Sequence, residues 1–162
     1  MASVVNNFIE YAGLADNLPQ NPTTFKQFTV QENLEIPCAK PDIEQIIRVM
    51  GHVKITSTRV IRTPGSAAQP VKSLEGQILT GWKLIVEGEL IQKIEYVADE
   101  PTQSVHAAHF SVPFSTFIVL PANYALGTPV HVTPYIEDIY AQQIGKRCIF
   151  KNVTIFLNAT VV

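Results

Sequence analysis

The chain has 162 residues, 14 of them acidic and 12 basic, with a formal net charge of −2 at pH 7. This length fits one domain with a sizeable core. Hydrophobic residues make up 46% of the sequence and charged residues only 16%, the opposite of the balance in disordered chains. A weakly charged surface is expected where other subunits cover it. No basic cluster exceeds the pair Lys146 and Arg147, so we expect no nucleic-acid partner.

The N-terminal segment is predicted to be an arm in front of a β domain. Residues 3–14 carry apolar side chains at helical spacing and reach Gly13 where a helix would end, which predicts a short amphipathic helix. The proline-containing segment 16–22 is typical of a linker. We therefore divide the chain into a helical arm with its Pro-rich linker, residues 1–22, and a β domain, residues 23–162.

Most of the β domain is predicted to form extended strands. Apolar and polar side chains alternate with a period of two over residues 25–36, 47–61, 82–97 and 148–162, as in strands with one buried face. Strands separated by loops, without regular alternation with helices, favour an all-β, single β-sandwich-like domain of mainly antiparallel strands. The second face of residues 148–162 mixes aromatic side chains with Asn and Thr, which fits a strand in contact with another subunit.

Two residues and two segments refine this outline. Pro113 lies in a further extended run, and because proline cannot donate to a sheet ladder, this strand is expected at an edge or a bulge. Gly88 predicts a bulge or bend in the longest run. Residues 42–47 permit either a capped helical turn or the approach to a strand, and residues 134–143 predict a helical turn.

His106 and His109 form an H-A-A-H motif. On a helix, the two side chains would share a face and could hold a metal ion. In the strand expected here they point to opposite faces, so ordinary packing or hydrogen bonding is favoured, and we assign no metal site. An enzyme or ligand-binding site would use these histidines with Glu87.

Glu87 and Glu89 lie on one face of the longest predicted strand. Such a pair can act as acid and base if proximity raises one pKa. The favoured interpretation is a solvated face neutralised by Lys83 and Lys93. Because the sequence also has no nucleotide-binding or serine-hydrolase motif, we expect a non-enzymatic protein without catalytic residues, cofactor or small-molecule substrate.

The two cysteines, Cys38 and Cys148, match no zinc-ligand spacing. They are either thiols that link subunits or buried reduced thiols, and the sequence leaves both alternatives open. The N-terminus has no basic start followed by an apolar core, and no apolar run approaches the length of a membrane span. We therefore expect synthesis in the cytoplasm without a signal peptide and no membrane-spanning segment.

Residues 25–28, 41–46, 84–99 and 103–118 resemble the SPOCS domain family, which is associated with the spore coat of endospore-forming bacteria, and the resemblance extends over roughly residues 8–162. It provides no catalytic residue to carry over. It implies a binding or building-block role, with synthesis in the mother cell and deposition on the spore surface.

The leading hypothesis is a structural building block of the coat, exosporium or a spore appendage that self-assembles into a polymer, lattice or fibre. Its expected partners are further copies of itself and other spore coat proteins. The alternative is a monomeric adaptor that recruits another coat morphogenetic protein through a strand edge. The expected self-assembly interface on the arm consists of Phe8, Ile9, Tyr11, Leu14 and Leu18.

Overall fold

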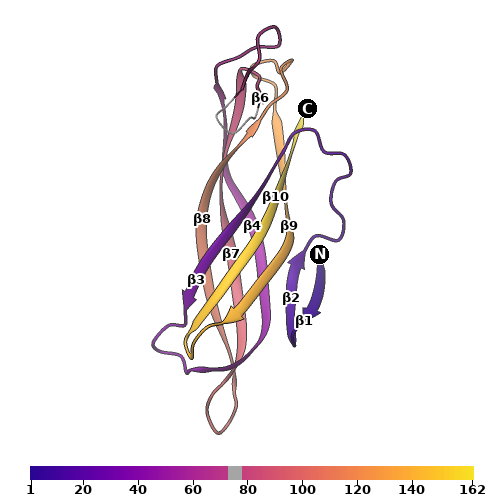
Figure 1. Cartoon of the computed structure of the whole chain (residues 1–162). Helices are drawn as coiled ribbons and strands as arrows, with labels where there is room; N and C mark the ends of the chain where they lie inside the picture. Colours follow the sequence, from indigo (N-terminus) through magenta and orange to yellow (C-terminus); the bar gives the residue numbers. More distant parts are fainter. Residues whose placement is uncertain (73–77) are drawn as a thin grey trace.

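The computed structural model describes residues 1–72 and 78–162, and these residues form strands and loops without a helix (Figure 1). The larger sheet contains, in spatial order, β1 (Ala2–Asn6), β2 (Ile9–Leu14), β4 (Ile43–Arg62), β7 (Trp82–Ala98) and β8 (Val105–Val119). The second sheet contains, in spatial order, β3 (Phe25–Glu35), β10 (Cys148–Val161) and β9 (Val130–Gln143). A small ribbon pairs β5 (Val71–Lys72) with β6 (Ile78–Leu79).

Among the described residues, every strand pair is antiparallel except β2 and β4, which are parallel. The prediction of an all-β domain with mainly antiparallel strands is therefore confirmed. The core lies between the two larger sheets, where alternate side chains of β7 and β10 face each other. Those that are at most 1% exposed include Leu84, Val86, Leu90, Ile94 and Tyr96 on β7 and Ile149, Val153, Ile155 and Leu157 on β10.

The predicted N-terminal helix is wrong, because residues 2–14 form a β-hairpin instead. Its two-residue turn consists of Asn7 and Phe8, which both have positive φ angles, 51° and 66°. A turn of this kind matches the twist of the strands that it joins. The β-branched Val4 and Val5 favour extended backbone over helix. The apolar spacing that predicted a helix is also compatible with two short strands.

Two further segments for which a helical turn was considered form strands in the structure. Residues 134–143 belong to β9, so the helical turn predicted there is wrong. Within residues 42–47, the strand alternative is correct, because β4 begins at Ile43. Strand pairing along the whole of β9 with β10 outweighs the weak local helical pattern.

The predictions for Pro113 and Gly88 agree with the strand pairing. Pro113 lies in β8, which is one of the two edge strands of the larger sheet. The register of β4 against β7 shifts between Ile55 and Ser57, opposite Gly88. A Cβ atom at Gly88 would lie 2.6 Å from the Phe114 ring and 2.7 Å from the Lys54 carbonyl oxygen. The position therefore requires glycine for space.

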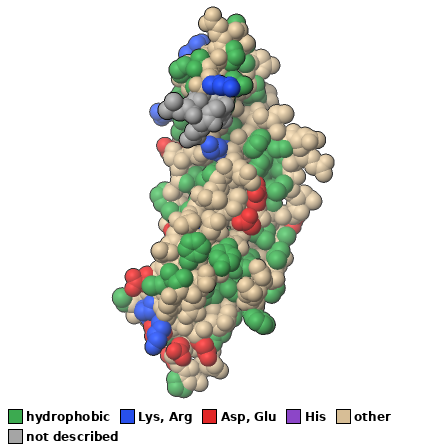
Figure 2. All heavy atoms as spheres, viewed as in Figure 1, with side chains coloured by type: hydrophobic (Ala, Val, Ile, Leu, Met, Phe, Trp, Pro, Cys, Tyr) green, Lys and Arg blue, Asp and Glu red, His purple; other side chains and the backbone are tan. Residues whose placement is uncertain are grey.

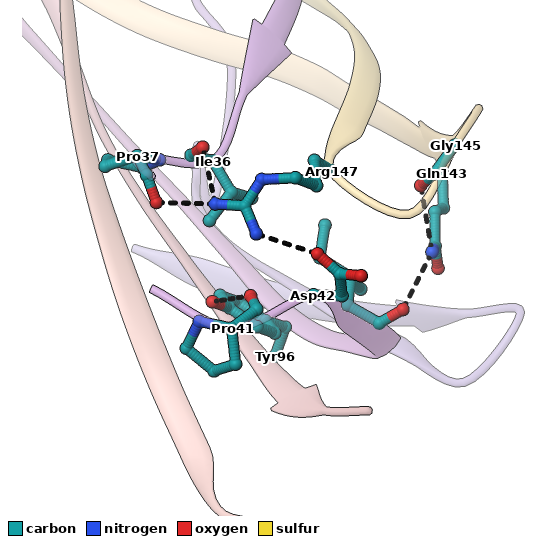
Figure 3. Close-up of polar contacts among 9 residues, drawn as sticks. Ile36, Pro37, Pro41, Asp42, Tyr96, Gln143, Gly145 and Arg147 are labelled. Atoms are coloured by element: carbon teal, nitrogen blue, oxygen red, sulfur yellow. Dashed lines mark hydrogen bonds and ion pairs between the residues drawn. The ribbon is translucent and has the colours of Figure 1, made fainter. Parts of the chain in front are cut away.

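One end of the sandwich is closed by Arg147, which follows the turn between β9 and β10 (Figure 3). Its guanidinium group donates to Asp42 Oδ1 at 2.8 Å and to the carbonyl oxygens of Ile36 and Pro37 at 3.1 and 2.6 Å. The hydrogen bond to Asp42 raises the pKa of Arg147. Because Arg147 holds the crossover between β3 and β4, it ties the second sheet to the first.

Candidate assembly surface

The N-terminal hairpin contains most of the predicted assembly residues, but the structure separates them into two groups. Ile9, Tyr11 and Leu14 are buried against the chain's own body. Phe8, at the tip of the hairpin, is 89% exposed, and Leu18 in the following loop is 43% exposed. The hairpin therefore presents one apolar face to the body and leaves its tip in solvent.

Few backbone contacts attach the hairpin to the body. The parallel pairing of β2 with β4 is limited to Glu10, Tyr11 and Ala12, opposite residues 48–50. The amide of Ala15 adds one hydrogen bond of 2.9 Å to a β9 carbonyl. The hairpin is thus an appended element that depends mainly on its buried apolar side chains, Ile9, Tyr11, Ala12 and Leu14.

Tyr11 provides the polar anchor of the hairpin. Its hydroxyl donates to the Ala141 carbonyl oxygen and accepts from the Ala141 amide, both at 3.2 Å. Burial raises the pKa of Tyr11 above its usual value of 10.0, and burial also raises that of Tyr96. Both side chains therefore resist ionisation as long as the chain stays folded.

We expect the free energy of unfolding to fall as the pH rises above about 10. The unfolded chain releases its tyrosine protons there, while Tyr11 and Tyr96 in the folded chain keep theirs. Tyr11→Phe should lower stability by about 1–2 kcal/mol at neutral pH and make the alkaline decline shallower. Denaturant unfolding at pH 8 and pH 11 measures both effects, and an unchanged alkaline decline in the variant would contradict this role of Tyr11.

The outer side of the hairpin is a strand edge with apolar side chains that no other strand in the described part of the chain pairs with. β1 is the edge strand of the larger sheet on the side opposite β8. Val5 is 71% exposed and Val4 52%, and both lie close in sequence to the exposed Phe8. Exposed apolar side chains on a free edge favour association with another chain.

A proline-containing loop joins the hairpin to β3. Figure 1 shows residues 15–24 running along the outside of the body between β2 and β3. Pro19 and Pro22 favour extended backbone in this loop. The loop is anchored again at its far end, where Ala159 donates to the Thr24 carbonyl oxygen at 2.9 Å.

The outer face of the second sheet carries very few charges. Figure 2 shows this side of the molecule, where hydrophobic and uncharged side chains cover most of the surface and charged groups stand in a few places near the middle and the two ends. Phe25 stacks on Phe156 with ring centroids 5.2 Å apart, and Tyr140 contacts the Phe150 ring edge to face at 6.1 Å. The mixed aromatic and amide face expected for residues 148–162 is therefore present on β10.

The outer edge of β8 is the other edge of the larger sheet, and no strand of residues 1–72 and 78–162 pairs with it. None of the fifteen residues of β8, Val105–Val119, is Asp, Glu, Lys or Arg. Protein edges are often protected by charge or by proline, and here Pro113 interrupts the row of donors. Either side of Pro113, the strand offers unpaired backbone groups.

The H-A-A-H histidines lie on β8 and do not share a site. His106 stacks on Tyr96 with centroids 5.9 Å apart, and its Nε2 is 2.9 Å from the Ser104 hydroxyl. His109 lies beside an open hollow of about 460 Å³, which Arg48 and Lys93 also line. Within residues 1–72 and 78–162, no three His, Cys, Asp or Glu side chains are placed to hold a metal ion.

Ser104, His106 and Glu100 lie together but are not arranged as a catalytic triad. The Ser104 hydroxyl donates to Glu100 Oε1 at 2.8 Å, so serine is the central member. A nucleophilic serine instead needs histidine between itself and the acid. This cluster is a hydrogen-bonded network at the end of a turn.

Glu87 is far from both histidines. It pairs with Ser115, whereas His109 pairs with Lys93, six residues further along β7, a separation of about 20 Å along the strand. Lys93 instead binds Glu95 at 2.8 Å and lowers the pKa of that carboxyl group. Lys83 lies over the Phe117 ring at 4.0 Å.

The two cysteines are not bonded to each other. Cys38 is exposed in the crossover between β3 and β4, and Cys148 is half-buried at the start of β10. The two alternatives for these thiols therefore differ by position, since Cys38 is accessible to another chain and Cys148 much less so.

The sequence analysis predicted a helix where the structure has the hairpin, although two weak signals for a hairpin are present in the sequence. Asn7 was a usable signal, because asparagine favours the positive φ angles of a two-residue turn. Alternation of Ile9 and Tyr11 was a second signal, although two residues alone do not separate a strand from a helix.

The fold and its surfaces define a class, an all-β sandwich whose larger sheet ends at the edge strands β1 and β8, with a loosely attached N-terminal hairpin. A family model, SipL, SPOCS domain, matches residues 42–144, and the chain belongs to this family. The match begins just before β4 and ends just after β9. A search of curated proteins and a search of solved structures each found no match. Family membership indicates a sporulation-related, spore-associated protein, and no described helix is long and apolar enough to cross a membrane.

Proposed function

We propose that this protein is a non-enzymatic building block of the bacterial spore surface that assembles with copies of itself into a polymer, lattice or fibre. The loosely attached, apolar N-terminal hairpin is the observation that carries this proposal. The weakly charged face of the second sheet supports it. The proposal includes deposition in the coat, the exosporium or an appendage, which membership of the family supports, and it includes other coat proteins as additional partners.

The proposed connection is exchange of the hairpin between neighbouring subunits. A hairpin that leaves its own body can occupy the same position on another copy, where Ile9, Tyr11 and Leu14 would be buried by the same contacts. Because those contacts are identical, exchange costs little apart from the extension of residues 15–24. Successive exchange in one direction joins subunits head to tail and produces an open chain.

The decisive experiment places a disulfide between the hairpin and its binding position. Glu10 and Arg48 are directly paired across β2 and β4, so a Glu10→Cys/Arg48→Cys variant, with Cys38 and Cys148 replaced by serine, reports which chain holds the hairpin. Assembled and oxidised protein should run as a ladder of covalent oligomers on a non-reducing denaturing gel. A matched control pairs His52→Cys with Ile91→Cys inside the body and should give a monomer band.

The outcomes separate assembly from hairpin exchange. A monomer band from assemblies that are visible by negative-stain electron microscopy would reject exchange and keep self-assembly through another surface. We also expect a chain that lacks residues 1–22 to assemble poorly. Unchanged polymers from that truncated chain would reject the role of the arm.

The uncharged edge of β8 favours a second candidate, a monomeric adaptor that binds a strand of another coat protein. Size-exclusion chromatography at high concentration distinguishes the two functions. A single monomer peak at every concentration, together with the absence of polymers in micrographs, would reject the building block and favour the adaptor.

A further inference from the structure

Three polar side chains from three strands meet inside the sandwich. Lys151 on β10 is fully buried, Gln92 on β7 is 2% exposed, and the side chain of Glu32 on β3 is 20% exposed. Lys151 Nζ and Gln92 Nε2 each donate to the same atom, Glu32 Oε1, at 3.0 Å. One carboxylate oxygen therefore holds an amine from the second sheet next to a carboxamide from the first.

A buried ion pair explains only part of this cluster. Lys151 and Glu32 are direct neighbours across β10 and β3 and can form an ion pair without a third residue. Gln92 adds a carbonyl oxygen, Oε1, that is buried and has no hydrogen-bond partner among the described residues. A buried acceptor without a partner lowers stability, and such groups in native proteins call for a specific explanation.

The surroundings of the cluster favour reaction of the amine. Lys151 is paired on its other side with Ala141 of β9, and Gln92 is paired with Phe110 of β8. Burial lowers the pKa of Lys151, and the hydrogen bond to Glu32 opposes that shift. A lysine that is removed from water and joined to a carboxylate can lose its proton to that carboxylate and become a nucleophile.

We propose that Lys151 and Gln92 form an intramolecular isopeptide bond and that Glu32 transfers the protons. Lys151 passes a proton to Glu32, and its neutral Nζ attacks Cδ of Gln92. Glu32 gives its proton to the carboxamide oxygen as the tetrahedral intermediate forms. As the intermediate collapses, the bond between Cδ and Nε2 breaks, protons from the oxygen and Nζ reach the leaving nitrogen, and ammonia departs as ammonium.

The step requires no oxidant, metal or second substrate. One amine and one carboxamide yield one new amide and one ammonium ion, and Glu32 returns to its carboxylate form, where it can accept a hydrogen bond from the new amide N–H. The bond joins β10 to β7 and thereby fastens the two sheets covalently. Glu32 is the catalytic residue of this reaction because it touches both reacting nitrogens.

Intact mass spectrometry of the folded full-length protein, denatured immediately before measurement, tests the proposal. The expected mass is lower than the sequence mass by one molecule of ammonia. Trypsin should fail to cleave after Lys151, and the digest should contain residues 84–93 joined to residues 148–162. A folded chain at its full sequence mass, or a loss of ammonia that maps elsewhere, would overturn the proposal.

Variants distinguish the loss of the proposed reaction from the loss of the folded structure. Glu32→Gln and Lys151→Met should each show the full sequence mass expected for the variant. Glu35→Gln, on the same strand but exposed, should lose ammonia as the unaltered chain does. Persistence of the joined peptide in Glu32→Gln would overturn the role of Glu32. Whether the bond exists is decided by the mass of the unaltered chain alone. Misfolding of a variant therefore does not affect that result.

Discussion

Tyr96→Ala is expected to lower the free energy of unfolding by about 3–5 kcal/mol, because it leaves a large cavity between the sheets. Tyr96 is fully buried in β7. Its hydroxyl donates to the Pro41 carbonyl oxygen at 2.8 Å (Figure 3), so the side chain also holds the crossover that leads into β4. Loss of the ring therefore weakens both the core and the end of the sandwich that Arg147 closes.

Tyr96→Phe isolates the hydroxyl and should cost about 1 kcal/mol. Urea unfolding followed through the fluorescence of Trp82, the only tryptophan, measures both variants. Ser111→Ala on the exposed side of β8 is the surface control and should stay within about 0.5 kcal/mol of the unaltered chain. Equal losses for the alanine and phenylalanine variants would contradict the assignment of the larger effect to packing.

Gly13→Ala is expected to release the N-terminal hairpin. Gly13 has a φ of +96°, and a Cβ atom there would lie 2.0 Å from the Gly51 carbonyl oxygen. The strained backbone and the clash with β4 both act on the parallel pairing of β2, and together they should weaken the attachment of the hairpin by about 3 kcal/mol. Hydrogen exchange of residues 9–14 should become fast while that of β7 stays slow.

Gly127→Ala is the matched control for this prediction. Gly127 has a φ of +92°, but no atom of residues 1–72 and 78–162 would lie within 4 Å of a Cβ atom at this position. Gly127→Ala should lower the free energy of unfolding by about 1–2 kcal/mol through backbone strain alone. It should leave the hydrogen exchange of residues 9–14 unchanged. Slow exchange of β2 in Gly13→Ala would show that the hairpin tolerates the added methyl group and would contradict the tight contact.

The long strands were predictable because their alternation continues over many residues. In β7, the apolar positions from Leu84 to Tyr96 recur with a period of two, and no helix would place them on one face. Pro113 also located an edge strand correctly, since proline cannot bond to a neighbour on its N–H side. The hairpin was not predictable in the same way, because each of its strands has only five or six residues and the close contact of Gly13 with Gly51 is a tertiary effect.

The sequence contains one indication of the polar cluster at Glu32, namely polar residues at strand positions whose side chains should be buried. Lys151 occupies the apolar parity of residues 148–162, and Gln92 occupies the apolar parity of residues 82–97. A polar residue in an otherwise buried register needs a partner. Sequence alone could not show that the two residues meet at Glu32, because that depends on how the sheets are aligned.

The 20 residues of β4 determine the long dimension of the folded subunit. At about 3.3 Å per residue, this strand extends for about 65 Å, and Figure 1 shows the other long strands running roughly alongside it. Subunits laid end to end along a fibre would therefore repeat at close to that spacing, whereas subunits stacked sideways would repeat at a much shorter one. The axial periodicity in a diffraction pattern of aligned fibres would thus reveal how each subunit is oriented.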